Sequence, residues 1–366
     1  MALQCGIVGL PNVGKSTIFN ALTESGIPAE NYPFCTIEPH IGIVELPDDR
    51  LAQLSNIYQP KLTTPATVEF IDIAGLVRGA SRGEGLGNQF LGQIRQTSAI
   101  LHVIRCFEDE NTVHVNGAIN PLRDVETIET ELLLADLSTL EKRKIKIEKN
   151  SNVSDKDSYK KLEVIDTLIK ECSSGIAARR IELSDGDMSY KKSLQLLTDK
   201  PVLYVANVDE KSITSFQKND FIKDLKHHAS KEKNKIIYLC GSIEEEISHL
   251  TFEEKPTFLE SYSLNEPGLN KVIRSSFELL NLEIFFTCGE KEVRAWTITK
   301  GTTAPKAAGN IHSDFERGFI KADVFHYSQI IENKSEKALR NLGLIRQEGK
   351  DYIVKDGDCI YFKFNV

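Results

Sequence analysis

The segment GLPNVGKS at residues 9–16 constrains this chain more than any other part of it. It has the pattern G-x-x-x-x-G-K-[ST] and lies between an apolar run at residues 3–8 and a helix-forming stretch at residues 16–22. A strand, a glycine-rich turn and a helix in this order gather backbone N–H groups at the positive end of the helix dipole. Because that arrangement binds phosphate, the sequence predicts a nucleotide site at residues 12–17.

The motif assigns separate roles to its side chains and its backbone. We expect Lys15 to neutralise the β- and γ-phosphate oxygens, and Ser16 to offer its hydroxyl to Mg²⁺. The glycines allow the chain to curl closely around the β-phosphate. The backbone N–H groups in this prediction belong to Asn12, Val13, Gly14, Lys15, Ser16 and Thr17.

A carboxylate and a threonine downstream complete the predicted magnesium site. Asp72 begins the pattern D-x-x-G at the end of an apolar run, residues 67–73, which places it where a Mg²⁺-bound water would lie. Alone, this pattern also fits a strand followed by a turn, but beside a phosphate loop it is typical of switch-type nucleotide hydrolases. Thr36, in a loop between the two motifs, is either a hydroxyl that reaches Mg²⁺ when a γ-phosphate is present or a surface threonine.

Base recognition is expected after a later strand, in the sequence NVDE at residues 207–210. GTP-specific proteins carry N-K-x-D at that place. Asn207 keeps the first position, Val208 replaces the lysine whose stem covers the base, and Glu210 is one methylene longer than aspartate. A carboxylate in poor register with guanine leaves buried polar groups unpaired, so we predict weakened guanine selectivity. Ser242, after the next strand, is a further candidate for the base side or part of a simple turn.

Alternating strand-like runs and helical stretches predict an α/β domain in the N-terminal part of the chain. The strand-like runs lie at residues 3–9, 41–46, 67–73, 99–107, 201–207 and 235–240. Apolar residues at helical spacing, with a polar break at residues 150–158, predict an inserted pair of antiparallel helices. Short strand-like runs at residues 284–288, 295–299, 352–354 and 359–364, with turn glycines between them, then predict a small β-rich domain. The predicted boundaries are 1–282 for the first domain, interrupted by the insert at 125–198, and 283–366 for the second.

The insert is locally basic although the chain is acidic overall. Residues 141–180 hold 11 Lys and Arg against 7 Asp and Glu, whereas the whole chain has a net charge of -8. That net charge disfavours a protein that coats nucleic acid over its whole surface, and it is compatible with a local basic patch. Two interpretations of the insert stay open, a solvated helical hairpin and a contact with phosphate backbone.

Composition and cysteine usage exclude several classes of protein. Hydrophobic residues at 40% and charged residues at 27% are ordinary globular values, and no run of eighteen apolar residues predicts a membrane span. No export signal is visible at the start of the sequence. Seven cysteines without a C-x-x-C pair indicate neither a disulfide framework nor a zinc site. We therefore expect a cytoplasmic protein.

Longer runs of sequence carry a family resemblance. The runs are GLPNVGKST from residue 9, NYPFCTIEP from residue 31, DIAGLVRGASRGEGLGNQFL from residue 72 and RAWTITKGTTAPKAAGNIHSDFERGFIKADV from residue 294. The chain resembles the YchF or Obg-like ATPases, in the translation-factor branch of the P-loop GTPases, over essentially its whole length. The resemblance implies an α/β fold: an Obg-type P-loop NTPase G domain with a mostly parallel sheet, an antiparallel helical coiled-coil insert, and a small β-grasp-like TGS domain.

The same resemblance implies a Mg²⁺-dependent ATPase that prefers ATP over GTP, turns over slowly, and binds the ribosome to regulate translation or a stress response. The family has a hydrophobic residue in place of the water-orienting glutamine of GTPases, and Leu76 stands there in this chain. Lys15 and His114 are the catalytic candidates. Lys15 would neutralise the phosphate oxygens. His114 lies in a predicted loop, and a loop histidine can orient or deprotonate water. A solvated surface histidine is the alternative for His114. We expect a monomer without a membrane or sequence-specific DNA partner.

Two other functions stay open at this point. A binding module would use ATP as a structural or sensory ligand and would regulate by interaction. A GTP-specific translation factor would bind guanine through Asn207 and the nearby carboxylate. Stimulation of hydrolysis by ribosomes separates an ATPase from the first, and a comparison of ATP with GTP binding tests the second.

Overall fold

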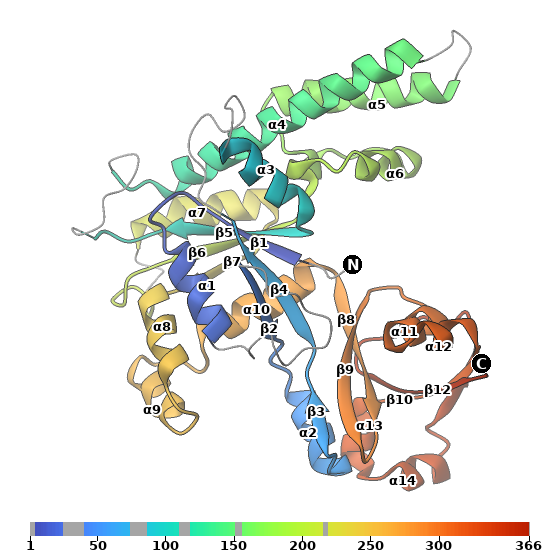
Figure 1. The fold of residues 1–366 in the computed structure, drawn as a ribbon. Coiled ribbons are helices and arrows are strands. Elements are labelled where there is room, and N and C mark those ends of the chain that lie inside the picture. Colours follow the sequence, from blue (N-terminus) through green and yellow to red (C-terminus); the bar gives the residue numbers. More distant parts are fainter. Residues whose placement is uncertain are drawn as a thin grey trace. The chain divides into compact units, whose positions relative to one another are not determined.

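The computed structural model of this 366-residue chain describes residues 4–24, 40–73, 86–109, 118–150, 156–214 and 219–365. Contacts divide the chain into two compact units, residues 1–43 with 69–272 and residues 44–68 with 273–366. Figure 1 labels the helices and strands of both units. No helix in the described ranges combines the length and apolar character that crossing a bilayer requires.

The first unit is built on a six-stranded sheet with the order β2-β4-β1-β5-β6-β7. Its strands are β1 (Gln4–Val8), β2 (Ile41–Glu45), β4 (Thr67–Asp72), β5 (Ala99–Arg105), β6 (Val202–Asn207) and β7 (Ile236–Leu239). β1 pairs in parallel with β4 and β5, and the parallel pairing continues through β6 to β7. Every residue of β5 and β6 is buried, as expected of central parallel strands covered on both faces. The predicted mostly parallel sheet is confirmed.

Helices of this unit outside the insert lie between its strands and after β7 (Figure 1). They are α1 (Lys15–Glu24), α3 (Leu86–Gln96), α7 (Asp220–Glu232), α8 (Gly241–His249), α9 (Glu254–Ser261) and α10 (Gly268–Leu279), whose last residues belong to the second unit. α1 packs against α8, so the helix that begins at the phosphate loop is supported by one that begins beside Ser242. Parallel strands present their carboxyl ends at one edge, where ligands of such sheets bind.

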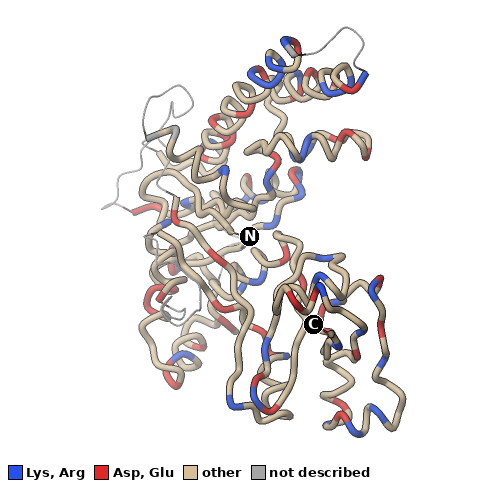
Figure 2. Tube along the Cα trace, turned by 45° about the vertical axis from the view of Figure 1, so that its right-hand side comes forward, with Lys and Arg blue, Asp and Glu red and all other residues tan. Residues whose placement is uncertain are grey.

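A helical insert separates β5 from β6. It contains α4 (Pro121–Asn150), α5 (Lys156–Ser173), the short 3-10 helices η2 (Ala178–Arg180) and η3 (Leu197–Asp199), and α6 (Asp185–Ser193). α4 packs on α5 around buried apolar side chains such as Leu140 and Ile165. The buried carboxylate of Asp136 ties α4 to η3 because it accepts bonds from the N–H groups of Leu197 and Thr198 at 2.7 and 2.8 Å. Figure 2 shows Lys and Arg interspersed with Asp and Glu along the hairpin.

The second unit is built on a mixed sheet with the order β11-β10-β12-β8-β9-β3. Its strands are β3 (Leu62–Thr64), β8 (Leu282–Cys288), β9 (Glu292–Thr299), β10 (Phe319–His326), β11 (Arg346–Glu348) and β12 (Asp358–Phe364), and its helices are α2 (Asp49–Tyr58), α11 (Ala304–Ile311), α12 (Ser313–Arg317), α13 (Tyr327–Asn333) and α14 (Glu336–Asn341). The run around Ile353 that predicted a strand forms only an isolated bridge to Thr303.

Residues 44–68 belong to this second unit, whereas the sequence-based boundaries leave them in the N-terminal domain. The physical reason is pairing over long sequence distances. β3 pairs in parallel with β9, with Leu62 opposite Glu292. The Tyr58 hydroxyl donates to Glu336 Oε1 at 2.9 Å across 278 residues of sequence. Local sequence patterns carry no signal for partners that are so distant.

Arg50, on α2, forms the best-connected polar contact between this segment and the rest of the second unit. Its guanidinium donates to both carboxylate oxygens of Asp48 and, at 2.6 Å, to Oδ2 of Asp356. The guanidinium carbon also lies 5.4 Å from the ring centre of Phe286 and 5.5 Å from that of Tyr327. Two ion pairs and two aromatic contacts therefore depend on one half-buried side chain.

Replacement of Arg50 by alanine should destabilise the second unit by about 2–4 kcal/mol, because it leaves the partly buried Asp48 without its cation. Trp296 is the only tryptophan of the chain and lies on β9, so its fluorescence during urea unfolding reports on this unit. Arg317→Ala is the control: its side chain is 76% exposed and also pairs with an aspartate. Equal midpoints for the two variants would contradict the role given to Arg50.

Candidate functional site

The phosphate loop connects β1 to α1 through a turn that requires glycine at two positions. At Gly9, an added Cβ would lie 2.5 Å from the Val103 carbonyl oxygen, which is closer than carbon and oxygen can approach. At Gly14, φ is 95° and an added Cβ would lie 2.3 Å from Nδ2 of Asn207. α1 then begins at Lys15, with its unpaired N–H groups and the positive end of its dipole at the loop.

Lys15 and Asp72 interact beside this loop, and burial disfavours the charge of each. The Lys15 ammonium donates to the Leu10 carbonyl oxygen at 2.8 Å, and the residue is only 8% exposed. Burial lowers the pKa of Lys15, and the Asp72 carboxylate opposes that shift. Burial likewise raises the pKa of Asp72, against the influence of Lys15 and His40. The site therefore stabilises an added anion near Lys15 and an added cation near Asp72.

Asp72 and Ser16 are the described residues that fit a Mg²⁺ ion. Oδ1 of Asp72 is buried and has no hydrogen-bond partner in the described part of the chain. Ser16 is exposed in the first turn of α1. Mg²⁺ takes few protein oxygens and keeps several waters, so a lone carboxylate and a hydroxyl supply ligands of the required kind. Thr36, the predicted second hydroxyl, lies outside the described residues.

The side-chain amide of Asn207 joins the phosphate loop to the loop after β7. Its Nδ2 donates to the Val13 carbonyl oxygen at 3.0 Å, and its Oδ1 accepts from the Gly241 N–H at 2.9 Å. Asn207 is only 4% exposed, so these bonds are shielded from water. One amide thus fixes the distance between the two walls of the site.

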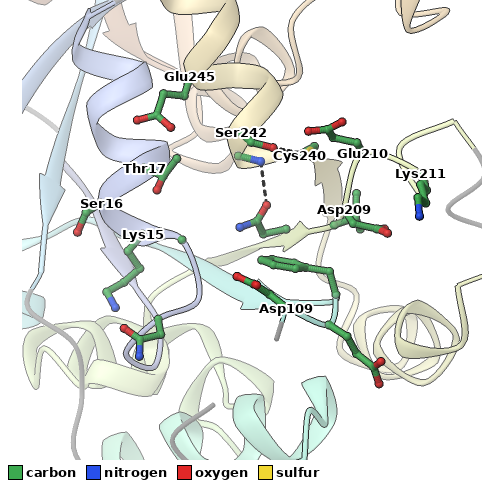
Figure 3. A pocket seen from close by; sticks show the side chains of 17 residues that line it. Lys15, Ser16, Thr17, Asp109, Asp209, Glu210, Lys211, Cys240, Ser242 and Glu245 are labelled. Carbon is green, nitrogen blue, oxygen red and sulfur yellow. Dashed lines mark hydrogen bonds between the residues drawn. The ribbon is translucent and has the colours of Figure 1, made fainter. Parts of the chain in front are cut away.

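A pocket of about 710 Å³ lies at this edge of the sheet (Figure 3). Its lining consists of Asn12, Gly14, Lys15, Ser16, Thr17, Phe107, Glu108, Asp109, Asn207, Val208, Asp209, Glu210, Lys211, Cys240, Gly241, Ser242 and Glu245. Of the residues predicted to bind nucleotide, only Val13 is missing from this lining, and it contributes its carbonyl oxygen to Asn207. Figure 3 shows Lys15 and Ser16 on one side, and Asp209 and Glu210 on the other. This polarity directs phosphates to the Lys15 side.

The opposite side of the pocket has the groups expected to meet a base. Val208 is buried, and its N–H donates to the Leu239 carbonyl oxygen at 2.9 Å. Glu210 is exposed in the pocket wall, and Asp209 has a buried Oδ1 without a hydrogen-bond partner among the described residues. Ionised carboxylates accept hydrogen bonds and donate none, so this wall favours a base edge with amino groups.

No sequence motif singles out Phe107, the aromatic residue in the described lining. The run at residues 99–107 predicts a strand throughout, but β5 ends at Arg105 and leaves Phe107 in the loop at the ligand-binding edge. Arg105 is buried, donates to the Phe107 carbonyl oxygen at 3.1 Å, and places its guanidinium carbon 4.8 Å from the ring centre. Phe107 could have been found from the rule that ligands lie at the carboxyl ends of parallel strands.

The predicted water-positioning residue lies outside the described part of the chain, as does Leu76. That residue is His114, in the segment 110–117 that follows the Phe107 loop. His102, by contrast, is buried on β5, and burial lowers its pKa to about 3. His102 therefore remains neutral at physiological pH and cannot serve as a charged acid in the pocket.

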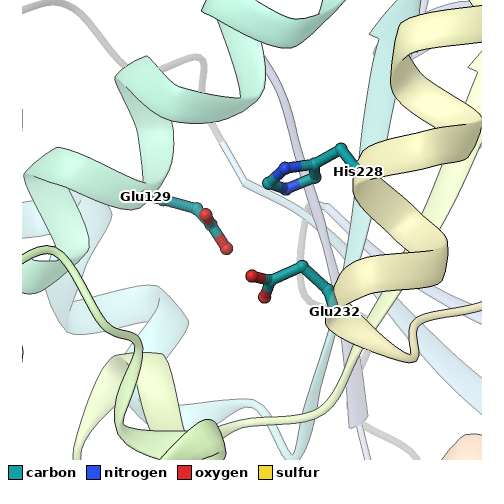
Figure 4. A group of neighbouring side chains, drawn as sticks. All are labelled: Glu129, His228 and Glu232. Atoms are coloured by element: carbon teal, nitrogen blue, oxygen red, sulfur yellow. The ribbon is translucent and has the colours of Figure 1, made fainter.

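A second group of titratable side chains joins the insert to the sheet domain (Figure 4). Glu129 of α4 faces His228 and Glu232 of α7, and their ligand atoms lie within 4.8 Å of one another. The Arg179 guanidinium donates to both carboxylates, with Glu232 at 3.1 Å. Arg180 also donates to Glu232, at 2.7 Å. Because two arginines already pair with these two carboxylates, we interpret the group as an ion-pair network that connects the insert to α7 and not as a metal centre.

Comparisons with known proteins agree with this arrangement. A family model described as 50S ribosome-binding GTPase matches residues 4–144, and the YchF-GTPase_C model, described as a protein of unknown function, matches residues 282–365. Proteins named ribosome-binding ATPase YchF are 50% identical in Escherichia coli O157:H7 and 49% identical in Bacillus subtilis, over 100% of both chains.

A solved structure agrees as well. It is described as the Schizosaccharomyces pombe YchF GTPase, has a TM-score of 0.90 and 37% identity, and the match covers 99% of this chain and 97% of that one. Identity near one half without a gap in coverage, together with the shared fold of both units, places the chain in one family: it belongs to the YchF family.

Proposed function

We propose that this chain is a Mg²⁺-dependent ATPase that binds the ribosome and acts there as a nucleotide-controlled switch. The observation that carries the proposal is the pocket lined by the phosphate loop and Lys15, because the nearby Asp72 carboxylate interacts with Lys15 and its Oδ1 has no hydrogen-bond partner among the described residues. Relatives that match the whole chain are named ribosome-binding ATPases, which supports both the reaction and the partner. A ribosomal partner places the protein in the cytoplasm.

The proposed chemistry is the hydrolysis of ATP to ADP and phosphate. Lys15 and the N–H groups at the start of α1 would hold the β- and γ-phosphates, with Ser16 and Asp72 on the metal side. Mg²⁺ would supply charge neutralisation for the phosphate oxygens. His114 is proposed to orient the attacking water. Thr36 is proposed to respond to the γ-phosphate, so the proposed switch segments are the one that contains Thr36, before β2, and residues 75–87.

ATP is proposed as the preferred nucleotide because the base wall departs from the guanine pattern. Val208 is buried where GTP-specific proteins expose a lysine, and Glu210 stands where they carry aspartate. Adenine offers one exocyclic amino group to such a carboxylate, whereas guanine presents two donors, N1–H and N2–H, that need a carboxylate in register with both. The second unit is proposed to be a TGS domain that contacts the ribosome together with the helical insert.

Calorimetric titration of nucleotide-free protein should show that a non-hydrolysable ATP analogue binds at least about tenfold more tightly than the GTP analogue, each with Mg²⁺. Hydrolysis should be slow alone and faster with purified ribosomes. Tighter GTP binding would replace the ATPase assignment by a GTPase. ATP binding without hydrolysis in either condition would identify a sensory module.

Asn207→Ala should weaken ATP binding about tenfold or more, because it frees the phosphate loop from the loop at Gly241 and leaves two buried backbone groups unpaired. The matched control is Asn219→Ala. Asn219 also donates its amide to a backbone oxygen, of Cys106 at 3.0 Å, but does not line the pocket. The control should lose about 1 kcal/mol of stability and keep its ATP affinity. Equal affinities for both variants would count against the bridging role.

Asp72→Asn should abolish most of the Mg²⁺ dependence of ATP binding and slow hydrolysis about a hundredfold, because the neutral amide is a poor partner for a hydrated divalent ion. Binding is measured by titration with and without Mg²⁺. Glu69→Gln is the matched control, because it also replaces a carboxylate by an amide on β4, at a side chain that already accepts from Gln4 at 2.8 Å. Mg²⁺ dependence should persist in that variant, and its persistence in Asp72→Asn would remove Asp72 from the metal site.

A further inference from the structure

Arg105 is a buried cation that lies behind the nucleotide pocket and contacts two of its walls. It is the last residue of β5, is 1% exposed, and is not among the described residues that line the pocket. Its guanidinium donates to the Asn12 carbonyl oxygen in the phosphate loop at 3.5 Å. It also donates to the carbonyl oxygens of Phe107 at 3.1 Å and Asp109 at 3.4 Å. One side chain therefore connects the phosphate loop to residues 107–109, which we call the Phe107 loop.

The bond to Asn12 orients a group that is expected to bind phosphate. Arg105 lies opposite Asn207 in the sheet, and the two side chains hold consecutive carbonyl oxygens of the phosphate loop, those of Asn12 and Val13. In a planar trans peptide the carbonyl and the N–H that follows it point in opposite directions. The bond from Arg105 therefore directs the Val13 N–H away from the guanidinium. A cation on the carbonyl also polarises that peptide, which makes its N–H a stronger donor.

The Phe107 loop presents groups that suit the other end of a nucleotide. The Phe107 ring and the carboxylates of Glu108 and Asp109 line the pocket. An aromatic face suits a base, and carboxylates accept hydrogen bonds from ribose hydroxyls, whereas the same carboxylates repel phosphates. The guanidinium carbon of Arg105 lies 4.8 Å from the centre of the Phe107 ring, so Arg105 contacts both the ring and the backbone of this loop.

We propose that Arg105 is a positioning residue that keeps the phosphate loop and the Phe107 loop in register, so that both ends of one nucleotide bind together. The inference rests on the proposed function only because it takes the ligand to be a nucleotide. Two half-sites in register hold a linked ligand at a high effective concentration, and a shift of about 1 Å between them loses much of that gain. Lysine cannot replace Arg105 here, because its single ammonium lacks the planar fork that reaches both loops.

The test compares the unchanged chain with Arg105→Lys, which keeps the positive charge. Association constants are measured with Mg²⁺ for a non-hydrolysable ATP analogue, for adenosine and for tripolyphosphate, by displacement of a fluorescent ATP analogue. The constant of the ATP analogue divided by the product of the other two is the effective concentration that links the half-sites. We expect Arg105→Lys to lower this ratio about fivefold or more. A variant that is merely less folded would weaken all three ligands by the same factor, which raises the ratio.

Arg179→Lys is the matched control. Arg179 is also buried, with a side chain 11% exposed, and it also donates to a backbone oxygen, that of Thr198 at 3.4 Å. It is not among the described residues that line the nucleotide pocket. Its ratio should therefore stay within about twofold of that of the unchanged chain. Any result other than a selective fall of the ratio in Arg105→Lys would overturn the positioning role.

Hydrogen exchange on the unchanged chain tests the same connection without a variant, which matters if Arg105→Lys does not fold. Tripolyphosphate with Mg²⁺ should slow the exchange of backbone amides at residues 12–17. It should also slow exchange at residues 107–109, because Arg105 transmits the ordering of Asn12 to Phe107. Protection confined to residues 12–17 would show that the two loops are not connected and would overturn the proposal.

Two further measurements on the same samples separate this inference from the proposed function. They are ATP hydrolysis, and the same ratio for guanosine and a non-hydrolysable GTP analogue. A chain that prefers GTP or does not hydrolyse ATP would remove the ATPase assignment, and the ratio for the tighter nucleotide would still test Arg105. Hydrolysis of ATP by the unchanged chain, with an unchanged ratio in Arg105→Lys, would uphold the proposed function and overturn the positioning role.

Discussion

The bond pair made by Asn207 is the constraint on which the geometry of the nucleotide pocket depends. β1, β6 and β7 each end at the same edge of the sheet, but the loops that follow them have no ladder to hold them together. The Asn207 amide replaces that ladder with one donor bond to Val13 and one acceptor bond from Gly241. Gly14 is required for the same reason, because any larger residue would displace the amide.

The electrostatics of the pocket are incomplete in the protein alone. Burial pushes the pKa of Lys15 down and that of Asp72 up, so the folded chain bears a cost for keeping both charged. Phosphate oxygens beside Lys15 and a hydrated cation beside Asp72 would relieve both costs together. The free energy stored in this way favours a nucleotide–metal complex over either component alone.

The sequence predicted those parts of the molecule whose physical causes are local. The phosphate loop, the parallel strands and the two insert helices follow from glycine positions and apolar spacing over short stretches. The contacts of Arg50 and Tyr58 could not be predicted, because their partners, Asp356 and Glu336, lie far along the chain. The position of Phe107 in the pocket could not be predicted, because an apolar run does not show where its strand ends.

The predicted strand around Ile353 failed for a related reason. Its composition suits a strand, but the sheet offers it one bridging partner, Thr303, and no continuous neighbour. Roles that depend on residues outside the described ranges, those of Thr36 and His114, stay predictions from the sequence.

The pairing of β3 with β9 has a consequence for folding during translation. Leu62 is translated long before its partner Glu292, and at about 5–20 residues per second the delay is about 10–50 s. During that interval the apolar face of α2, including Leu51 and Leu54, has no second-unit sheet to cover it. The nascent chain must therefore carry an unpaired strand and an uncovered helix while residues 69–272 of the first unit are made, which exposes it to misfolding and to capture by chaperones.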